Sequence, residues 1–198
     1  VISCSPPDGN RNDAVGPPLE GVELRIHEDG EILVRGELVM NGYWNKPDAT
    51  HDAIGDGWLH TGDIGVVDGD GFVKITDRKK DIIVNSGGDN VSPQRIEGLL
   101  ALEPEIAQAM VYGDRRPHLV ALIVASDLLE GDEDIKSKID AALVRVNAGL
   151  APMERVRRCI LADAPFTIEN GQMTPTLKVR RHILKEIYET RLGALYHQ

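Results

Sequence analysis

Residues 58–84 have the sequence WLHTGDIGVVDGDGFVKITDRKKDIIV, and this stretch decides how the chain is organised. The apolar runs IGVV and FVKIT flank Asp68-Gly69-Asp70-Gly71, which is a strong signal for a β-hairpin. The charged segment at 77–81, Asp-Arg-Lys-Lys-Asp, follows the hairpin, and the texture of the sequence changes after it. We therefore expect a linker at this segment and a boundary between two domains.

The residues before this boundary predict a β-rich domain. Residues 1–18 are rich in Pro, Gly, Asn and Asp, which is typical of a loop. From Gly21 to Asp77 the pattern is that of strands, with VELRI and EILVR flanking the turn HEDG at 27–30. The segment GYWNKPDAT at 42–50 predicts a connection broken by proline and followed by a helical turn.

The residues after the boundary alternate between strand and helix patterns, which predicts an α/β domain. Ser92-Pro93 has the form of a helix N-cap followed by proline in the first turn. The expected strands are 82–85, 106–113, 119–125 and 158–163, and the expected helices start at Ser92, Ile135 and about Lys178. The last helix has Ile183, Ile187 and Leu195 among its apolar positions. The predicted fold class is thus α+β / α/β, a β-rich part followed by a small α/β domain.

Composition and charge limit the function classes. The chain has 198 residues and a net charge of −10, which argues against a nucleic-acid partner. Residues 153–198 form the one basic part, with 8 Lys and Arg against 5 Asp and Glu. We therefore expect any anionic ligand to be met there. No apolar run is long enough for a membrane span, and the start of the chain does not resemble a signal peptide.

Two further features bear on origin and compartment. The chain does not start with Met, which suggests a piece of a longer protein. Cys4 and Cys159 lie far apart without metal-ligand spacing, so free thiols in a reducing cytoplasm are expected.

Four motifs follow one another along the chain: Thr61-Gly62-Asp63 followed by Arg78, the joint at 79–81, the loop SGGDN at 86–90, and TPTLKVRR at 174–181. They resemble the later core motifs of adenylate-forming enzymes, the superfamily of acyl-CoA synthetases, firefly luciferase and peptide-synthetase adenylation domains. The earlier family motifs, including the phosphate-binding loop, are not in this chain. The resemblance implies that residues 1–78 are the β-rich end of a large N-terminal adenylation domain. Residues 79–198 would be the mobile C-terminal domain.

Asp63 and Arg78 are the candidate nucleotide-binding residues. A carboxylate in a glycine-containing turn can accept hydrogen bonds from the two hydroxyls of a ribose, although Thr-Gly-Asp alone is also typical of a plain turn. The resemblance implies that Asp63 binds the AMP ribose and that Arg78 contacts the same nucleotide. A guanidinium suits a polyanion through its fixed fork of donors.

The resemblance also assigns a hinge and a CoA channel. The position two residues after Arg78 is Lys80, which corresponds to the family's hinge between the domains. An exposed polar residue can absorb a large change in φ and ψ without disturbing a core. Gly87 and Gly88 allow close approach of backbone to a thin ligand, although such glycines are also ordinary turn residues. The family uses this loop to line the channel for the pantetheine arm of CoA.

Lys178 is the candidate catalytic residue. An isolated lysine near a helix start is normally a solvated charge, but its place in TPTLKVRR matches the family's catalytic lysine. A positioned cation there would stabilise charge on the phosphoryl oxygens during attack of a carboxylate on ATP. Most family members have Gly just before this lysine, whereas this chain has Leu177. The form Thr-Pro-Thr-Leu-Lys, together with Asp-Arg-Lys-Lys at the hinge, resembles bacterial long-chain fatty acyl-CoA synthetases.

Other polar and aromatic residues are given structural roles. We expect Glu97 to be a surface carboxylate, His60 to be a structural histidine, and Trp44 and Trp58 to pack in or near the core. Arg180 and Arg181 follow Lys178, and we expect them to complement nearby carboxylates rather than hold phosphates.

Together these interpretations predict a fragment of a long-chain-fatty-acid–CoA ligase. The intact parent would use ATP to convert a fatty acid to acyl-AMP and then transfer the acyl group to CoA, releasing AMP. The Mg²⁺ ligands are expected outside this chain, in the rest of the adenylation domain, and the fragment alone is expected to be inactive. We expect a cytoplasmic protein; peripheral membrane association and oligomeric state stay open. Two alternatives remain: an adenylation domain that loads a carrier protein, and a non-catalytic module that binds AMP or a partner.

Overall fold

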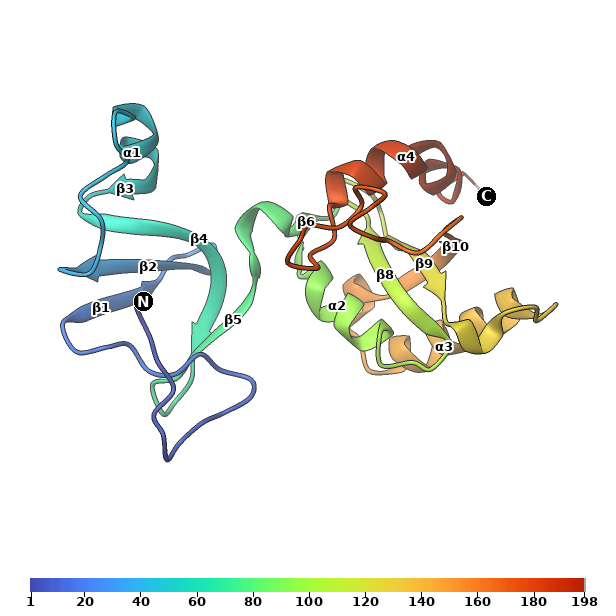
Figure 1. The fold of residues 1–198 in the computed structure, drawn as a ribbon, viewed down its shortest axis with the longest axis horizontal. Helices are drawn as coiled ribbons and strands as arrows, with labels where there is room; N and C mark the ends of the chain where they lie inside the picture. The colour runs from blue at the N-terminus through green and yellow to red at the C-terminus, as the bar shows by residue number, and fades with distance from the viewer. Residues whose placement is uncertain (198) are drawn as a thin grey trace. The chain divides into compact units, whose positions relative to one another are not determined.

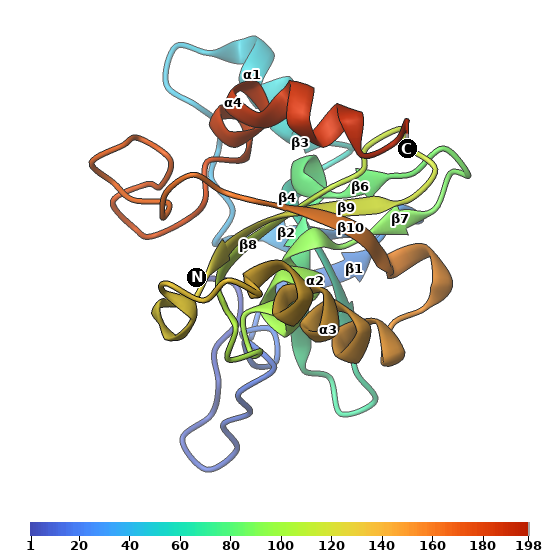
Figure 2. The same cartoon turned by 90° about the vertical axis from the view of Figure 1, so that its right-hand side faces the viewer.

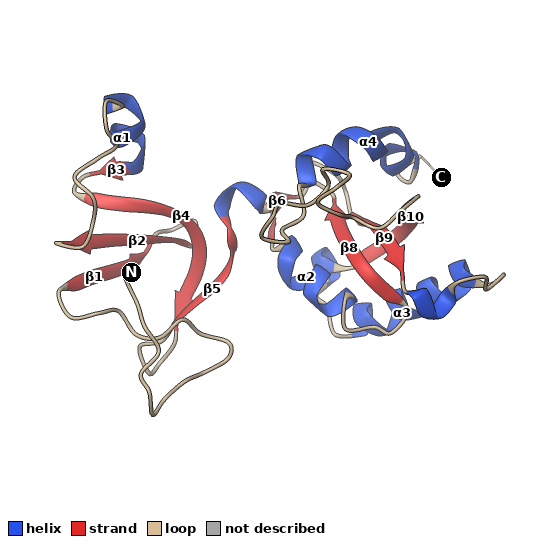
Figure 3. Cartoon of the chain, in the orientation of Figure 1, coloured by secondary structure: helices blue, strands red, loops and turns tan. Residues whose placement is uncertain are grey.

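The computed structural model describes residues 1–197, so Gln198, the last residue of the predicted second domain, lies outside it. The chain divides into two compact units, Val1–Asp81 and Ile82–Gln198. The division falls at the end of the charged segment 77–81, and the predicted boundary after Arg78 lies a few residues earlier. Strands dominate the first unit, and the second combines strands with longer helices (Figure 3).

The first unit is built on a five-stranded antiparallel sheet (Figure 1). Its strand order is β1-β2-β4-β3, with β5 paired to β4. The β1/β2 and β4/β5 pairs are the two hairpins that the sequence predicts. The elements are β1 (Val22–Ile26), β2 (Glu31–Gly36), α1 (Pro47–Ala53), β3 (Ile54–Gly55), β4 (Trp58–Val67), β5 (Val73–Arg78) and the 3-10 turn η1 (Lys79–Asp81).

One of the two tryptophans packs as expected and the other does not. Trp44 is 89 % exposed in the described chain, which contradicts its predicted packing role. Trp58 is half-buried, and the guanidinium groups of Arg25 and Arg35 stack on its ring at 4.3 and 4.7 Å from the centroid. The core of this unit is instead the aliphatic cluster around Ile32, Val34 and Val73.

Two β-bulges distort β4 and β5 where the candidate nucleotide site lies. Glu31 and Leu33 of β2 pair with Ile64 and His60 of β4, so β4 has two extra residues between these pairs. Further along, Ile64 and Gly65 pair with Asp77 and Ile75 of β5, so β5 has one extra residue, Thr76. Bulges re-aim side chains and are frequent beside active sites.

Gly65 makes the second bulge sterically feasible. A Cβ atom there would lie 2.4 Å from the carbonyl oxygen of Lys74 and 2.7 Å from Cδ1 of Ile32. The carbonyl belongs to the backbone of the paired strand, so β4 and β5 would have to separate to admit a methyl group.

We predict that Gly65→Ala lowers the free energy of unfolding of the first unit by about 2 kcal/mol, because overpacked sites cost this order of energy. Both tryptophans of the chain lie in this unit, so urea unfolding followed by tryptophan fluorescence reports on it. Gly69→Ala is the matched control, since nothing lies within 4 Å of a Cβ built there. Equal stability of the two variants would contradict the steric argument.

The second unit is built on a three-stranded sheet of order β10-β9-β8. Strands β8 and β9 are antiparallel, whereas β9 and β10 are parallel. Helices α2 and α3 lie on one face of this sheet and α4 lies on the other (Figure 2). The elements are β6 (Ile83–Val84), β7 (Asn90–Val91), α2 (Pro93–Leu100), β8 (Ile106–Tyr112), β9 (Leu119–Ala125), η2 (Asp127–Leu129), α3 (Ile135–Ala148), η3 (Pro152–Glu154), β10 (Val156–Leu161) and α4 (Arg181–Ala194).

The central strand β9 is apolar on both faces because both are covered. Leu119, Ala121 and Ile123 pack against the cluster that includes α2 and α3. The alternate residues Val120, Leu122 and Val124 pack against the cluster that includes α4. This explains the continuous apolar run LVALIVA, which is typical of a strand buried on both sides.

The prediction for the last helix is partly wrong. Helix α4 begins at Arg181, not at Lys178. Its buried residues are Leu184, Tyr188 and Leu192, whereas Ile187 is 54 % exposed. Spacing by four residues places the buried side chains on one helical face, and Tyr188 takes a core position that an aliphatic-only pattern misses.

Candidate functional site

The first bulge holds Thr61-Gly62-Asp63 inside strand β4, which corrects the predicted glycine-containing turn. Backbone groups in a bulge lose ladder partners and need other ones. The Thr61 hydroxyl donates to the carbonyl of Ile32 at 2.7 Å and accepts the N–H of Asp63 at 3.1 Å. Gly62 has φ +72°, and its N–H donates to the Glu31 carboxylate at 2.9 Å. The position therefore favours glycine, and the bulge presents Asp63.

Asp63 and Arg78 lie directly across from one another on β4 and β5. The Arg78 guanidinium and the Asp63 carboxylate form an ion pair, with 2.7 Å between Nε and Oδ1. The side chains are 22 % and 50 % exposed, so a ligand can reach both. The ion pair joins one guanidinium nitrogen to one carboxylate oxygen. A group with vicinal hydroxyls and an anionic phosphate matches the chemistry of the pair.

His60 has a structural contact, in agreement with the sequence interpretation. Its Nδ1 lies 2.9 Å from Oε2 of Glu31, a carboxylate that is only 3 % exposed. The donors to the Glu31 side chain are His60, Gly62 and Lys79, which lie 29 to 48 positions later in the chain, so no local pattern predicts these contacts.

The candidate hinge lies in the 3-10 turn η1. Lys80 is exposed in this turn, two residues after Arg78. The next residue, Asp81, is the last of the first unit. An exposed residue beside the division between the units can change its backbone angles without disturbing either core.

The glycine loop connects the short strands β6 and β7, and Asn85 shapes it. The Asn85 side-chain oxygen accepts the N–H groups of Gly87 and Asp89 at 2.8 and 3.0 Å, and its amide donates to Asp89 at 3.0 Å. Gly87 and Gly88 are exposed, and Gly88 has φ +88°. The backbone at these glycines is therefore open to a thin ligand.

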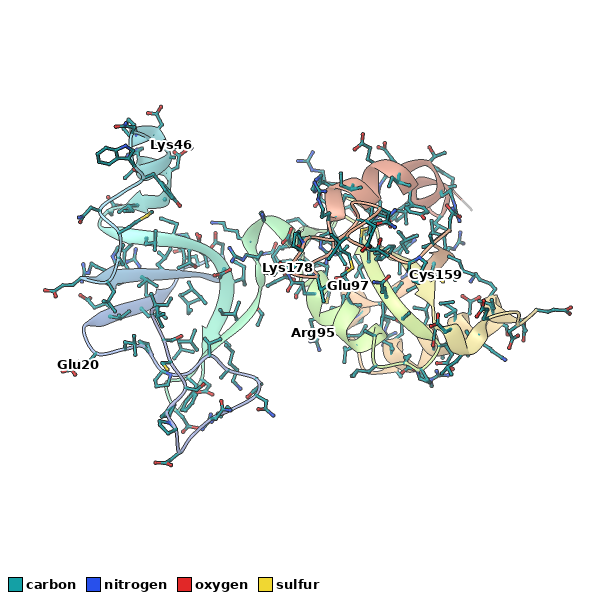
Figure 4. The ribbon with its side chains drawn as sticks, in the orientation of Figure 1. Glu20, Lys46, Arg95, Glu97, Cys159 and Lys178 are labelled. Atoms are coloured by element: carbon teal, nitrogen blue, oxygen red, sulfur yellow. The ribbon has the colours of Figure 1, made fainter. Side chains whose placement is uncertain are left out.

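Lys178 lies in a tight hairpin rather than at a helix start. The N–H of Thr174 donates to the carbonyl of Lys178 at 2.8 Å, and the Thr174 hydroxyl accepts the N–H of Lys178 at 3.1 Å. An isolated bridge between Met173 and Val179 closes the hairpin. The Lys178 side chain is exposed in the loop before α4 (Figure 4).

Leu177 occupies the left-handed region with φ +59°. Only glycine adopts this region readily, and other L-residues lose roughly 1–2 kcal/mol there. The turn geometry thus explains why glycine would suit this position. The Leu177 side chain is 68 % exposed, so packing does not offset the backbone strain.

We predict that Leu177→Gly stabilises the second unit by about 0.5–1 kcal/mol, the relief of left-handed strain less the entropy cost of glycine. Leu177→Ala is the matched control, because it removes the same exposed side chain but keeps the strain. Urea unfolding followed by circular dichroism measures both. A gain in the alanine variant equal to that in the glycine variant would refute the backbone explanation.

The two arginines after Lys178 have structural partners. Arg181 forms an ion pair with Glu97, and each side chain is only 14 % exposed. Glu97 also accepts the N–H of Val111 at 2.6 Å, so it is not the surface carboxylate that we expected. Arg180 donates to the carbonyl of Gly171 at 3.1 Å. The expectation of a carboxylate partner is confirmed for Arg181, whereas the contact shown for Arg180 is to backbone.

The described residues bring together some of the predicted site residues. Asp63 and Arg78 form one site in the first unit, with Lys80 close by in sequence, and Gly87 and Gly88 share a loop in the second. Lys178 belongs to the second unit. Among residues 1–197, no group of three or more His, Cys, Asp or Glu side chains could hold a metal ion. Over the same range, no helix is long and apolar enough to cross a membrane.

A strand-rich unit with a carboxylate–guanidinium pair is followed along the chain by a small α/β unit with a lysine hairpin, which is the organisation that the resemblance to adenylate-forming enzymes implies. The family model "AMP-binding enzyme C-terminal domain" matches residues 80–198. The chain belongs to this family of AMP-binding enzymes.

Known proteins similar to this chain agree with that family. The long-chain-fatty-acid–CoA ligase FadD15 of Mycobacterium tuberculosis is 40 % identical over 203 residues, which cover 93 % of this chain and 34 % of the ligase. The adenylation domain of a carboxylate reductase from Mycobacterium chelonae superposes with a TM-score of 0.81 at 28 % identity. That match covers 94 % of this chain and 32 % of the other.

A third similar protein is the A-PCP didomain of a carboxylic acid reductase from Segniliparus rugosus, in complex with AMP. Its TM-score is 0.79 at 29 % identity, and the match covers 92 % of this chain and 28 % of the other. The chain thus spans about a third of the length of the proteins it matches.

Proposed function

We propose that this chain is the C-terminal part of an ATP-dependent long-chain-fatty-acid–CoA ligase. The observation that carries the proposal is the Asp63–Arg78 pair, held on a strand bulge close to the division between the units. The name of the relative FadD15 supports the substrate class. The parent would join a fatty acid to AMP with release of pyrophosphate, and then exchange AMP for the thiol of CoA.

In the first half-reaction Asp63 would accept hydrogen bonds from the ribose hydroxyls of ATP. Arg78 would donate from its guanidinium N–H groups to the nucleotide. These contacts place the α-phosphate for attack by the fatty acid carboxylate, which is catalysis by positioning. The Mg²⁺ ligands and the grip on the triphosphate would come from the part of the parent that precedes this chain.

Lys178 would stabilise the charge that develops on the α-phosphoryl oxygens. Its hairpin fixes the backbone through Thr174, so the ammonium approaches from a defined position. A preorganised cation in this role stabilises the transition state without reorganisation of solvent. We assign Lys178 to acyl-AMP formation only.

In the second half-reaction the residues that follow Lys80 would rotate as a domain about Lys80, relative to the residues that precede it. The rotation would withdraw Lys178 and bring the loop of Gly87 and Gly88 to the site. The open backbone at these glycines suits the thin pantetheine arm of CoA. The single family fold would thereby offer a different surface to each half-reaction.

One structural relative favours a second candidate function, the loading of an acyl group onto a carrier protein. The A-PCP didomain matches this chain nearly as well as the adenylation domain does. Both candidates share acyl-AMP formation and differ only in the thiol that accepts the acyl group. The identity with FadD15 is higher, so we favour CoA as the acceptor.

A coupled assay on the full-length parent, with ATP, CoA and fatty acids of increasing chain length, tests the proposal. We expect pyrophosphate release that depends on long chains, followed by formation of acyl-CoA. Pyrophosphate release without acyl-CoA would favour the carrier-loading candidate. If no acid gave pyrophosphate release, both candidates would be overturned, and a non-catalytic module that binds AMP or a partner would remain.

We predict that Lys178→Ala in the parent slows acyl-AMP formation by about a hundred-fold or more, because it removes the cation at the transition state. Formation of acyl-CoA from added acyl-AMP should be spared. Lys185→Ala, which removes a lysine of the following helix, should leave both half-reactions unchanged. Equal loss in the two half-reactions of the Lys178 variant would contradict its assignment to the first.

We predict that Lys80→Pro in the parent impairs thioester formation more than acyl-AMP formation, since proline fixes φ and restricts the residue before it. Lys80→Ala, which removes the charge but leaves the backbone free, should retain both half-reactions. Single-turnover rates measured separately for each half-reaction give the comparison. Equal slowing of both steps by proline would show that the hinge lies elsewhere.

A further inference from the structure

One buried carboxylate contacts both the nucleotide bulge and the residue before the hinge. Glu31, at the start of β2, has a side chain that is 3 % exposed. Its Oε1 accepts the N–H of Gly62 at 2.9 Å. Its Oε2 lies 2.9 Å from Nδ1 of His60 and accepts from Nζ of Lys79 at 2.8 Å.

The chemistry of these contacts fixes their direction. An ionised carboxylate only accepts hydrogen bonds, so His60 must have its proton on Nδ1. Burial by itself raises the pKa of the Glu31 carboxyl, and the donors Lys79, His60 and Gly62 more than offset that effect, so its pKa is lowered. Asp29 and Glu31 both raise the pKa of Lys79. Glu31 is therefore an anion and Lys79 a cation at neutral pH.

A second carboxylate, that of Asp29, also binds Lys79. The Nζ atom of Lys79 lies 2.7 Å from Oδ2 of Asp29, in the tight turn that precedes β2. The other oxygen of Asp29 accepts the N–H of Glu31 at 3.1 Å and lies 2.9 Å from Nδ1 of His27. The ammonium of Lys79 thus joins two carboxylates whose own positions are fixed.

The partners of Glu31 are neighbours of the candidate site residues along the chain. Gly62 immediately precedes Asp63, and Lys79 lies between Arg78 and Lys80. Glu31 therefore holds residues adjacent to both members of the Asp63–Arg78 pair and to the hinge. Withdrawing Lys79 would leave a buried carboxylate with fewer donors, which is costly. The contacts with Glu31 therefore restrain the backbone as far as Lys79. Lys80 is the first residue that this anchor does not hold.

We propose that Glu31 is a positioning residue that couples the nucleotide bulge to the fixed side of the hinge, through Gly62 on one side and Lys79 on the other. This inference rests on the proposed function. Glu31 orients Asp63 toward the ribose, and its pairing with Lys79 keeps Arg78 opposite Asp63 while the following domain rotates. Loss of the carboxylate would affect both nucleotide affinity and the balance of the half-reactions.

The experiment compares variants of the full-length parent by AMP titration and by the rates of the two half-reactions. Glu31→Gln keeps the size and one acceptor oxygen but places an amide among donors. We expect about tenfold weaker AMP binding, the order of one lost hydrogen bond to a charged group, and a shifted ratio of half-reaction rates. Lys79→Met should shift the ratio as well, with a smaller effect on AMP, and Lys79→Arg should restore it.

The double variant separates coupling from two unrelated losses. If Glu31 acts through Lys79, Glu31→Gln together with Lys79→Met should shift the ratio no further than Glu31→Gln alone. If the double variant shifted the ratio by the product of the two single shifts, Glu31 and Lys79 would act independently and the coupling would be refuted. Glu23→Gln is the matched control, since this exposed carboxylate pairs with Arg35 on the same sheet and should alter neither readout.

The binding readout distinguishes this inference from the proposed function. A purely structural role would lower the melting temperature of Glu31→Gln and leave AMP affinity and the rate ratio of the folded enzyme unchanged, which would overturn the inference. If the parent formed no acyl-AMP, the proposed function would fall. Weaker AMP binding by Glu31→Gln would then still support the positioning role, and unchanged binding would refute it.

Discussion

The bulge in β4 is the constraint on which the candidate nucleotide site depends. Because β4 has two more residues than β2 between the same paired positions, the backbone at 61–63 cannot complete the ladder. The Thr61 hydroxyl and the Glu31 carboxylate supply the missing partners. Only with these contacts does Asp63 reach the register position opposite Arg78. The motif Thr-Gly-Asp is therefore one unit: a hydroxyl that satisfies the backbone, a glycine with positive φ, and the carboxylate that the bulge presents.

The same solution recurs in the second unit. Asn85 shapes the glycine loop by accepting two backbone N–H groups, and Thr174 shapes the lysine hairpin by accepting the N–H of Lys178. In each of the three places a short polar side chain accepts a backbone N–H group two to four residues later in the chain. The residue proposed to meet the ligand and the residue that fixes its backbone are thus different, and a substitution of either would disturb the same site.

This division explains what the sequence could and could not predict. The hairpins and the N-cap of α2 depend on residues a few positions apart, and they were predicted correctly; Ser92 accepts the N–H of Arg95. The bulge at 61–63 depends on Glu31, thirty-one positions before Gly62, so the local sequence predicts a turn there. The local sequence also predicts a surface position for Glu97, because its partner Arg181 lies 84 positions away. The start of α4 was misplaced because the hairpin of Lys178 ends only at Val179, where Met173 closes it.

Two arginines hold the base of the Lys178 hairpin, and their contacts limit how this lysine could reach a nucleotide. At its base, Arg181 joins α4 to α2 and β8 through Glu97 and the carbonyl of Val111. Arg180 binds the carbonyls of Gly171 and Gln172 through its side chain and its N–H. Thr174 fixes the tip of the hairpin. In the proposed reaction Lys178 would therefore be carried to and from the nucleotide together with its unit. Rotation about Lys80, beyond the anchor of Lys79 on Glu31, would supply such a motion and leave the Asp63–Arg78 pair in place.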